Sequence, residues 1–400
     1  MDALTTPSNW QRVRLGDIAE IIGGGTPSTQ ITSFWNGSIN WFTPTEIGIT
    51  KYVHKSQRTI TPLGLKKSSA KLLPIGTILL TSRASIGDCA ILKVVATTNQ
   101  GFQSLIPLEK INNEFLYYLM LTLKNKLLKL ASGSTFLEVS PNKIKNLLIP
   151  LPPLNEQIAI ANILSDVDHY LYSLRALILK KESVKKALSF ELLSQRKRLK
   201  GFNQAWQKVR LGTYKYRRGS FPQPYGNPQW YSDNGMPFVQ VYDVGENFKL
   251  NQKTKQKISK IAQPMSVFVP KNSVIITLQG TIGRVALTQY DCYCDRTILI
   301  FDNNTLNDVN KYFFVLSLFT KFEEEKRKAD GSIIKTITKQ TLKDFEILLP
   351  PLNEQIAIAN ILSDLDNEIA SLKNKKRQFE NIKKALNHDL MSAKIRVLNK

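Results

Sequence analysis

The stretch PPLNEQIAIANILSD occurs twice in the chain, at residues 152–166 and again 198 positions later, at 350–364. Internal repetition constrains a fold strongly, because each copy must build the same local structure. WQRVRLGD at Trp10 also matches WQKVRLGT at Trp206, and LPIGTILLTSRASIG at Leu73 matches VPKNSVIITLQGTIG at Val269. The chain is therefore two copies of one unit of about 200 residues. That length is too great for a solenoid repeat and fits a duplicated domain.

Each copy has a variable part followed by a nearly constant part. The variable parts match only in short, scattered motifs, and their patterns predict mixed α/β structure. The short β-branched runs at 75–82 and 272–279 predict strands, and the apolar spacing at 113–131 and 309–329 predicts helices. The Gly-rich and aromatic segment 23–44 predicts an extended loop.

The constant part predicts a long helix after each proline pair, since proline is tolerated before a helix but not inside one. Asn155 and Asn353 are candidate N-caps, and Ser165 with Asp166 could mark a kink or a second cap. Apolar residues beyond this point follow a short, imperfect heptad pattern. It favours two helices packed against each other, and the alternative is one amphipathic helix packed on each domain. The basic segment 195–204 is expected to be an exposed link.

These patterns predict an α+β fold with two pseudo-symmetric mixed α/β domains separated by two long antiparallel, coiled-coil-like helices. We place the first variable domain at 1–150 and the first helical spacer at 151–203. The second variable domain is placed at 204–348 and the second spacer at 349–400.

The charge balance indicates a polyanionic partner. Fifty-five Lys and Arg face 32 Asp and Glu, a net charge of +23, and nucleic acid is the partner that such an excess favours. A generally lysine-rich proteome is the alternative explanation. The three cysteines, the absence of a secretory signal pattern and the lack of an 18-residue apolar run predict a cytoplasmic protein that is not membrane-bound.

No residue pattern indicates catalysis or a metal site. The three histidines occur in no metal-ligand spacing, and Cys292 and Cys294 lack a second cysteine pair. A GxxxxGK[ST] phosphate loop is absent. Leucines flank the double prolines, without the polar and aromatic residues that adenine methyltransferases place there. We therefore expect no enzyme activity in this chain and no metal ligand.

The combination resembles the specificity subunit of type I restriction–modification systems. The resemblance rests on PLPPLNEQIAIANILSDVD and PPLNEQIAIANILSDLD, on the W..VRLGD opening, and on GGGTPS...FWNGSINW and TSRASIG...TTNQGFQSL. It implies that each variable domain is a target recognition domain reading one half of a split double-stranded DNA site. It also implies that the constant helices pack antiparallel and dock two methyltransferase subunits, with restriction/translocase subunits joining the full complex. S-adenosylmethionine, ATP and magnesium would belong to those partners, and this chain would hold no cofactor.

Direct readout of DNA needs side chains that reach base edges, and phosphate contacts need Lys, Arg and small polar donors. The second copy departs from the first at 212–230, as expected if the halves read different sequences. For each candidate, the alternative role is a solvated or turn-forming residue. The candidates in the first copy are Lys66, Lys67, Arg83, Ser85, Asn99, Gln100 and Gln103. Those in the second copy are Lys215, Arg217, Arg218, Gln279, Thr281, Arg284, Asp295 and Arg296.

The polar positions of the repeated fifteen residues match as well as the apolar ones. We interpret this as one surface shown to two copies of one partner, and a recent gene-level duplication is the rival explanation. The docking candidates are Asn155, Glu156, Gln157, Asn162, Asn353, Glu354, Gln355 and Asn360. Two other functions stay open at this stage, a stand-alone bivalent DNA-binding protein such as a repressor, and an enzyme with a cryptic active site.

Overall fold

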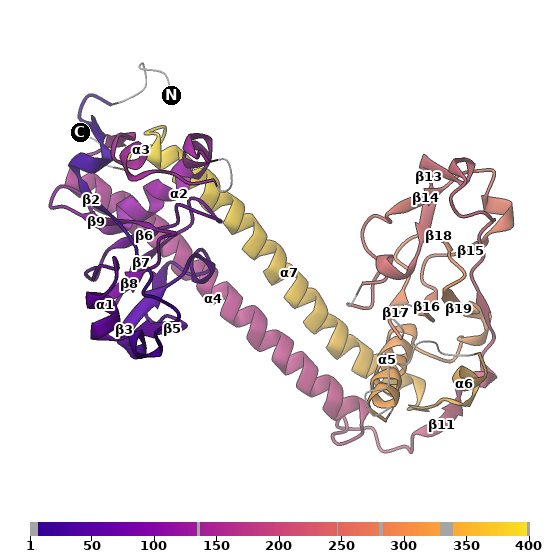
Figure 1. Ribbon diagram of the computed structural model, residues 1–400. Helices are drawn as coiled ribbons and strands as arrows, with labels where there is room; N and C mark the ends of the chain where they lie inside the picture. Colours follow the sequence, from indigo (N-terminus) through magenta and orange to yellow (C-terminus); the bar gives the residue numbers. More distant parts are fainter. Residues whose placement is uncertain (1–6, 134–136, 246, 280–282, 329–338, 398–400) are drawn as a thin grey trace. The chain divides into compact units, whose positions relative to one another are not determined.

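The computed structural model describes residues 7–133, 137–245, 247–279, 283–328 and 339–397. It divides into two compact units (Figure 1). Unit 1 is Met1–Leu177 with Leu372–Lys400, and unit 2 is Ile178–Ser371. Each unit therefore contains one variable domain, the beginning of the helix that follows it, and the end of the helix from the other repeat. Within the described residues, no helix is long and apolar enough to cross a membrane.

The variable domain of unit 1 contains two sheets and a two-stranded ribbon. The larger sheet has the order β2 (Ala19–Gly23), β9 (Gln103–Pro107), β6 (Ile78–Leu80), β7 (Cys89–Leu92) and β4 (Tyr52–Val53). The smaller has the order β5 (Arg58–Ile60), β3 (Trp35–Phe42) and β8 (Ala96–Thr98). The ribbon pairs β1 (Gln11–Arg14) with β10 (Leu148–Leu151). The α-helices of the domain are α1 (Pro62–Lys66), α2 (Asn113–Leu130) and α3 (Pro141–Lys145).

Burial on both faces explains why the sequence of strand β6 is a run of aliphatic residues and does not alternate with polar ones. Ile78 and Leu80 face a core that includes Phe115 of α2, whereas Leu79 faces a second core with Phe42 and Phe102. Because both faces of the strand are buried, every position is apolar. The predicted helix at 113–131 is confirmed, and it covers one face of this sheet.

The variable domain of unit 2 repeats this design with two four-stranded sheets among its described residues. One sheet has the order β12 (Tyr216–Arg218), β19 (Ile298–Phe301), β16 (Val274–Thr277) and β17 (Val285–Leu287). The other has the order β14 (Gln256–Ile258), β13 (Tyr231–Val239), β18 (Cys292–Cys294) and β15 (Val267–Val269). The ribbon pairs β11 (Gln207–Arg210) with β20 (Glu346–Leu349), and the α-helices are α5 (Lys311–Lys328) and α6 (Lys339–Asp344).

The two constant segments each form one helix of 40 residues, α4 (Leu154–Leu193) and α7 (Leu352–Met391). Within each unit they pair antiparallel. In unit 1, the rings of Tyr170 and Phe379 lie 4.6 Å apart. In unit 2, Lys181 bridges Glu368 at 2.8 Å and Lys185 bridges Asp366 at 2.5 Å. The predicted pair of packed helices is therefore confirmed.

Two local predictions are wrong. The helices run through Ser165 and Asp166 without a break and begin one residue before the expected caps, because the carbonyl of Pro153 or Pro351 accepts the first backbone N–H groups. Segment 23–44 contains strand β3, whose pairing is irregular between Trp35 and Ile39. Segment 195–204 is exposed or half-buried throughout, as predicted, and its Leu199 packs against the core of unit 2.

Candidate DNA interface and partner-docking surface

In unit 1, two loops that are far apart in the sequence meet beside the sheets. A Cβ on Gly24 would lie 1.9 Å from the carbonyl oxygen of Asn99, so only glycine permits this approach of the two backbones. The hydroxyl of Thr26 donates to the side-chain oxygen of Gln100, which is exposed. Asn99 accepts a 2.9 Å hydrogen bond from the N–H of Gly101 and thereby shapes the turn. The structure thus places two of the predicted DNA contacts, half-buried Asn99 and exposed Gln100, in one turn.

The other unit 1 candidates lie on nearby but separate elements. Lys66 and Lys67 are exposed at the end of α1. Ser85 is exposed in the turn after β6, and Arg83 forms a 2.7 Å ion pair with Glu138 that leaves its side chain 42% exposed. Arg83 would therefore have to exchange a carboxylate for a phosphate or a base.

Sequence reasoning missed Arg58, an exposed residue on β5. Its guanidinium lies 3.7 Å from the ring centre of Trp35 and 5.5 Å from that of Trp41. Both tryptophans are buried, so the rings hold the guanidinium plane in place while its edge stays accessible. The sequence carries no separate signal for this arginine. Only the β3–β5 register shows that it faces the two tryptophans across a strand pair.

In unit 2 the matching turn contains Asp295 and Arg296. Arg296 is exposed and its guanidinium lies 5.3 Å from the ring centre of Tyr225. Asp295 is buried and accepts hydrogen bonds from Tyr225 and from both donors of Thr297. Asp295 therefore holds the turn together and presents no free acceptor to DNA.

Two DNA-contact predictions are therefore wrong. Asp295 is one, and Gln103 is the other, because it is only 6% exposed on strand β9. A polar side chain in a loop-like sequence suggested an accessible residue at both positions. The actual burial depends on the strand pairing of Gln103 with Gly23 and on the hydrogen bonds of Asp295.

The remaining unit 2 candidates are spread over the domain. Lys215, Arg217 and Arg218 are exposed at strand β12, although Arg217 donates to the carbonyl oxygen of Phe268 at 3.1 Å. Gln279 is exposed, and Arg284 donates to the carbonyl oxygen of Val244 at 3.2 Å. Thr281 lies outside the described residues.

The docking prediction is wrong for four residues that the structure buries in the first turns of the two long helices: Glu156, Gln157, Glu354 and Gln355. Gln157 donates to the carbonyl oxygen of Pro152 and accepts from the N–H of Asn112, both at 2.9 Å. Gln355 makes the equivalent bonds to Pro350 and Asn310, at 2.8 and 2.9 Å. These glutamines satisfy polar groups at the entry of each long helix, which explains their identity without a partner.

Glu156 and Glu354 are equally internal. Glu156 accepts from the indole N–H of Trp10 at 3.1 Å and from Arg396 at 3.0 Å. Glu354 accepts from the indole N–H of Trp206 at 3.2 Å and from Arg198 at 2.6 Å. Each arginine follows the long helix of the other repeat, so each unit is closed by a residue from the opposite copy.

We expect Glu354→Ala to lower the free energy of unfolding by about 3 kcal/mol, because it leaves a half-buried arginine and a half-buried indole without their acceptor. Glu346→Ala is the matched control in the same unit. Its ion pair with Arg210 is 70% and 43% exposed, so the loss should stay below about 1 kcal/mol. Urea unfolding of both variants measures the difference. Equal losses would mean that the buried pair contributes no more than a surface pair.

What remains of the repeated segment is an identical exposed face in both units. In unit 1 it is formed by residues spaced at one side of α4, and we call it docking stripe 1: Leu154, Asn155, Ile158, Asn162 and Asp166. Docking stripe 2 on α7 is its exact repeat in type: Leu352, Asn353, Ile356, Asn360 and Asp364. Ile158 and Ile356 are 42% and 41% exposed, so each stripe displays aliphatic surface to solvent. Packing within the chain does not account for this match.

In each unit, a half-buried polar cluster fixes the variable domain to the helix pair. In unit 1, the hydroxyl of Tyr118 donates to Asp168 at 2.6 Å, and Lys383 from α7 bridges the same carboxylate. In unit 2, Tyr312 and Lys185 hold Asp366 in the same way. Burial and the aspartate hydrogen bond raise the pKa of Tyr118, so its hydroxyl remains a donor at neutral pH. Each domain is thus tied to both long helices through one aspartate.

Comparison with known proteins decides the family. The family model described as "Type I restriction modification DNA specificity domain" matches residues 7–181 and 219–381. The chain belongs to this family. It is 28% identical over 375 residues to the MjaIX type I restriction enzyme specificity subunit of Methanocaldococcus jannaschii, covering 86% of this chain and 84% of that one.

Solved structures agree on the fold. The type I restriction–modification S subunit from M. genitalium superposes with a TM-score of 0.60 at 17% identity, covering 98% of this chain and 97% of that one. The HsdS subunit from Thermoanaerobacter tengcongensis gives 0.54 at 21% identity, covering 98% of both chains. As a type I specificity subunit, this chain recognises DNA and has no catalytic role. Two family domains fit a bipartite target with one half-site for each, and the repressor alternative finds no support.

Proposed function

We propose that each unit reads its half-site with the turn where its two loops meet. In unit 1 this surface consists of Asn99 and Gln100 with Arg58 and Arg83 nearby on the same domain. In unit 2 it consists of Arg296 with the basic strand β12. Amides and arginines are the side chains that form bidentate contacts to bases, and the guanidinium groups of Arg58 and Arg296, held against Trp35 and Tyr225, are oriented in advance.

The docking stripes are the proposed contacts for two methyltransferase subunits, one on each unit. The identical exposed residues at matched positions support this, because two copies of one partner need the same surface twice. Restriction/translocase subunits would complete the complex. S-adenosylmethionine, ATP and magnesium would be bound by those partners. The three cysteines are buried and unpaired, which supports a reducing cytoplasmic location.

Ile158→Asp together with Ile356→Asp should abolish assembly with the cognate methyltransferase subunit, because a carboxylate replaces an aliphatic side chain at the centre of each stripe. Either single variant should retain one partner. Native mass spectrometry reports the stoichiometry directly. Leu179→Asp is the control, since Leu179 is 56% exposed on the same helix outside the stripes and should leave assembly unchanged. Full assembly of the double variant would refute the docking role of the stripes.

A further inference from the structure

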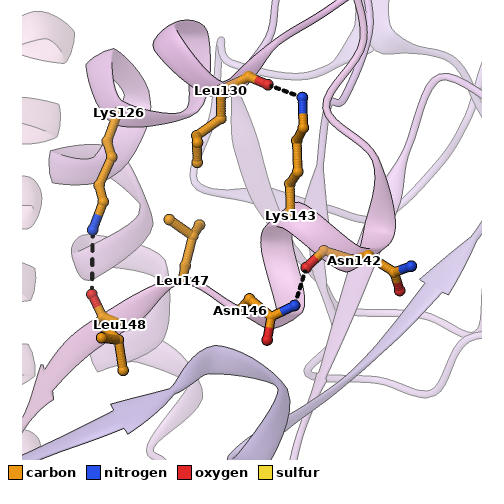
Figure 2. A pocket seen from close by; sticks show the side chains of 7 residues that line it. All are labelled: Lys126, Leu130, Asn142, Lys143, Asn146, Leu147 and Leu148. Carbon is orange, nitrogen blue, oxygen red and sulfur yellow. Dashed lines mark hydrogen bonds between the residues drawn. The ribbon is translucent and has the colours of Figure 1, made fainter.

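Unit 1 contains a groove that lies outside the DNA-recognition loops (Figure 2). Its volume is about 440 Å³, and it runs between the last turns of α2, helix α3 and the start of β10. Leu130, Leu147 and Leu148 form an apolar floor, and Lys126 and Lys143 stand on its two sides. The groove is large enough for one or two side chains of another protein.

The two lysines carry charge that the groove does not balance. The ammonium group of Lys143 donates to the carbonyl oxygen of Leu130 and to the hydroxyl of Ser132, both at 2.9 Å. Lys126 reaches only the carbonyl oxygen of Leu148, at 3.4 Å. Neither lysine has a carboxylate within ion-pair distance among the residues that the structure describes. Two ammonium groups beside an apolar floor fit a segment that combines acidic and apolar side chains.

Unit 2 has neither of the two lysines at the matched positions. Counting 198 residues onward, Lys126 corresponds to Glu324 and Lys143 to Thr341, and exposed Leu148 corresponds to Glu346. The helix starts align at this spacing, since Asn112 and Asn310 make the same cap and bond to matched glutamines. A segment that suits the groove of unit 1 would therefore find neither ammonium group in unit 2.

The groove continues into docking stripe 1 along the chain. Strand β10 leads through the proline pair directly into α4, and Leu148 of the groove and Leu154 of the stripe are 51% and 46% exposed. Groove and stripe are therefore joined by a short chain segment, from Leu148 to Leu154. The leucine floor also argues against DNA as the occupant, because phosphates bind where polar donors converge, without an apolar base.

We propose that this groove binds an acidic segment with an apolar side chain from the methyltransferase subunit docked on unit 1, so that two identical partners are held with unequal affinity. The proposal rests on the proposed docking of that subunit to the stripes. Loading is then ordered. The first methyltransferase subunit binds at unit 1, and the second occupies unit 2 only at higher concentration.

The test isolates the unit 1 site in the full-length chain. Ile356→Asp blocks stripe 2, and the cognate methyltransferase subunit is titrated into this background by calorimetry. Adding Lys126→Glu and Lys143→Glu should weaken the remaining site at least tenfold. The matched control adds Lys129→Glu and Lys145→Glu, which make the same charge change at exposed lysines of the same two helices outside the groove lining. That control should change the affinity less than threefold. Lys126→Gln with Lys143→Gln should give an intermediate loss without introducing acid.

Several results would overturn the proposal. Equal losses for the groove and control variants would mean that only net charge matters, and no loss for the groove variant would mean that the groove is not contacted. If the groove variant weakened DNA binding by the chain alone and left the partner titration unchanged, the groove would be a phosphate contact. Failure of the stripe docking is distinguished by Ile158→Asp, which in the same background would then leave partner binding intact.

Discussion

Residues 1–203 expressed alone are expected to form a homodimer. Unit 1 is completed by Leu372–Lys400, which such a fragment lacks. The fragment would lack Leu390 and Met391, so apolar surface of the unit 1 core would be uncovered. Buried Glu156 would also lose its ion pair with Arg396. Exposed core and an unpaired buried carboxylate both favour association with another chain.

The fragment contains its own substitutes for the missing segment, 198 positions earlier in the sequence. Lys185 corresponds to Lys383 and Arg198 corresponds to Arg396, and in unit 2 these two residues make the equivalent bonds to Asp366 and Glu354. Leu188 and Leu192, which pack against the core of unit 2, correspond to Leu386 and Leu390 of the unit 1 core. Two fragments can therefore complete each other by exchanging the ends of their helices.

Sedimentation velocity on the fragment measures its association state, with a two-subunit mass expected at micromolar concentration. Lys185→Glu with Arg198→Glu should shift the fragment to monomer, because both would face carboxylates in the partner copy. Lys180→Glu with Lys186→Glu is a control with the same charge change at lysines that pair with neither carboxylate. A folded monomer for the unaltered fragment would contradict the exchange of helix ends.

The duplication, the long paired helices and the α+β class could be predicted from sequence because each leaves a periodic signal over many residues. Repeats at fixed spacing revealed the duplication, and the proline pairs located both helix starts to within one residue. Helices α2 and α5 were likewise predictable from their apolar spacing. The turn that contains Asn99 and Gln100 could also be predicted, because Gly and Asn mark turns chemically.

Features that depend on contacts between distant residues could not be predicted. The buried state of Glu156 follows from Trp10 and Arg396, which lie 146 and 240 positions away in the sequence. An acidic residue in the first turn of a helix is normally exposed, so its conservation between the repeats suggested a surface. Arg58 was missed for a similar reason, since the register of β3 against β5 places it on Trp35.

Replacing residues 1–150 with the corresponding domain of another specificity subunit should change one half of the recognised DNA site and leave the other half intact. The variable domain of unit 1 builds both of its sheets and two of its hydrophobic cores within this range, and its recognition loops contact each other. The exchange keeps docking stripe 1, so assembly with the methyltransferase subunits should persist. Each mismatched base pair costs about 1–3 kcal/mol of binding free energy. Recognition of the old half-site should therefore be lost completely.

Sequencing of methylated bases in host DNA tests the central claim most directly, with cells expressing either the natural chain or the 1–150 exchange beside the same partner subunits. The natural chain should yield one motif of two defined halves separated by unspecified base pairs. The exchange should yield a motif with one half replaced and the other unchanged. A continuous motif, a change in both halves, or methylation that is the same without the chain would contradict a specificity subunit with one recognition domain for each half-site.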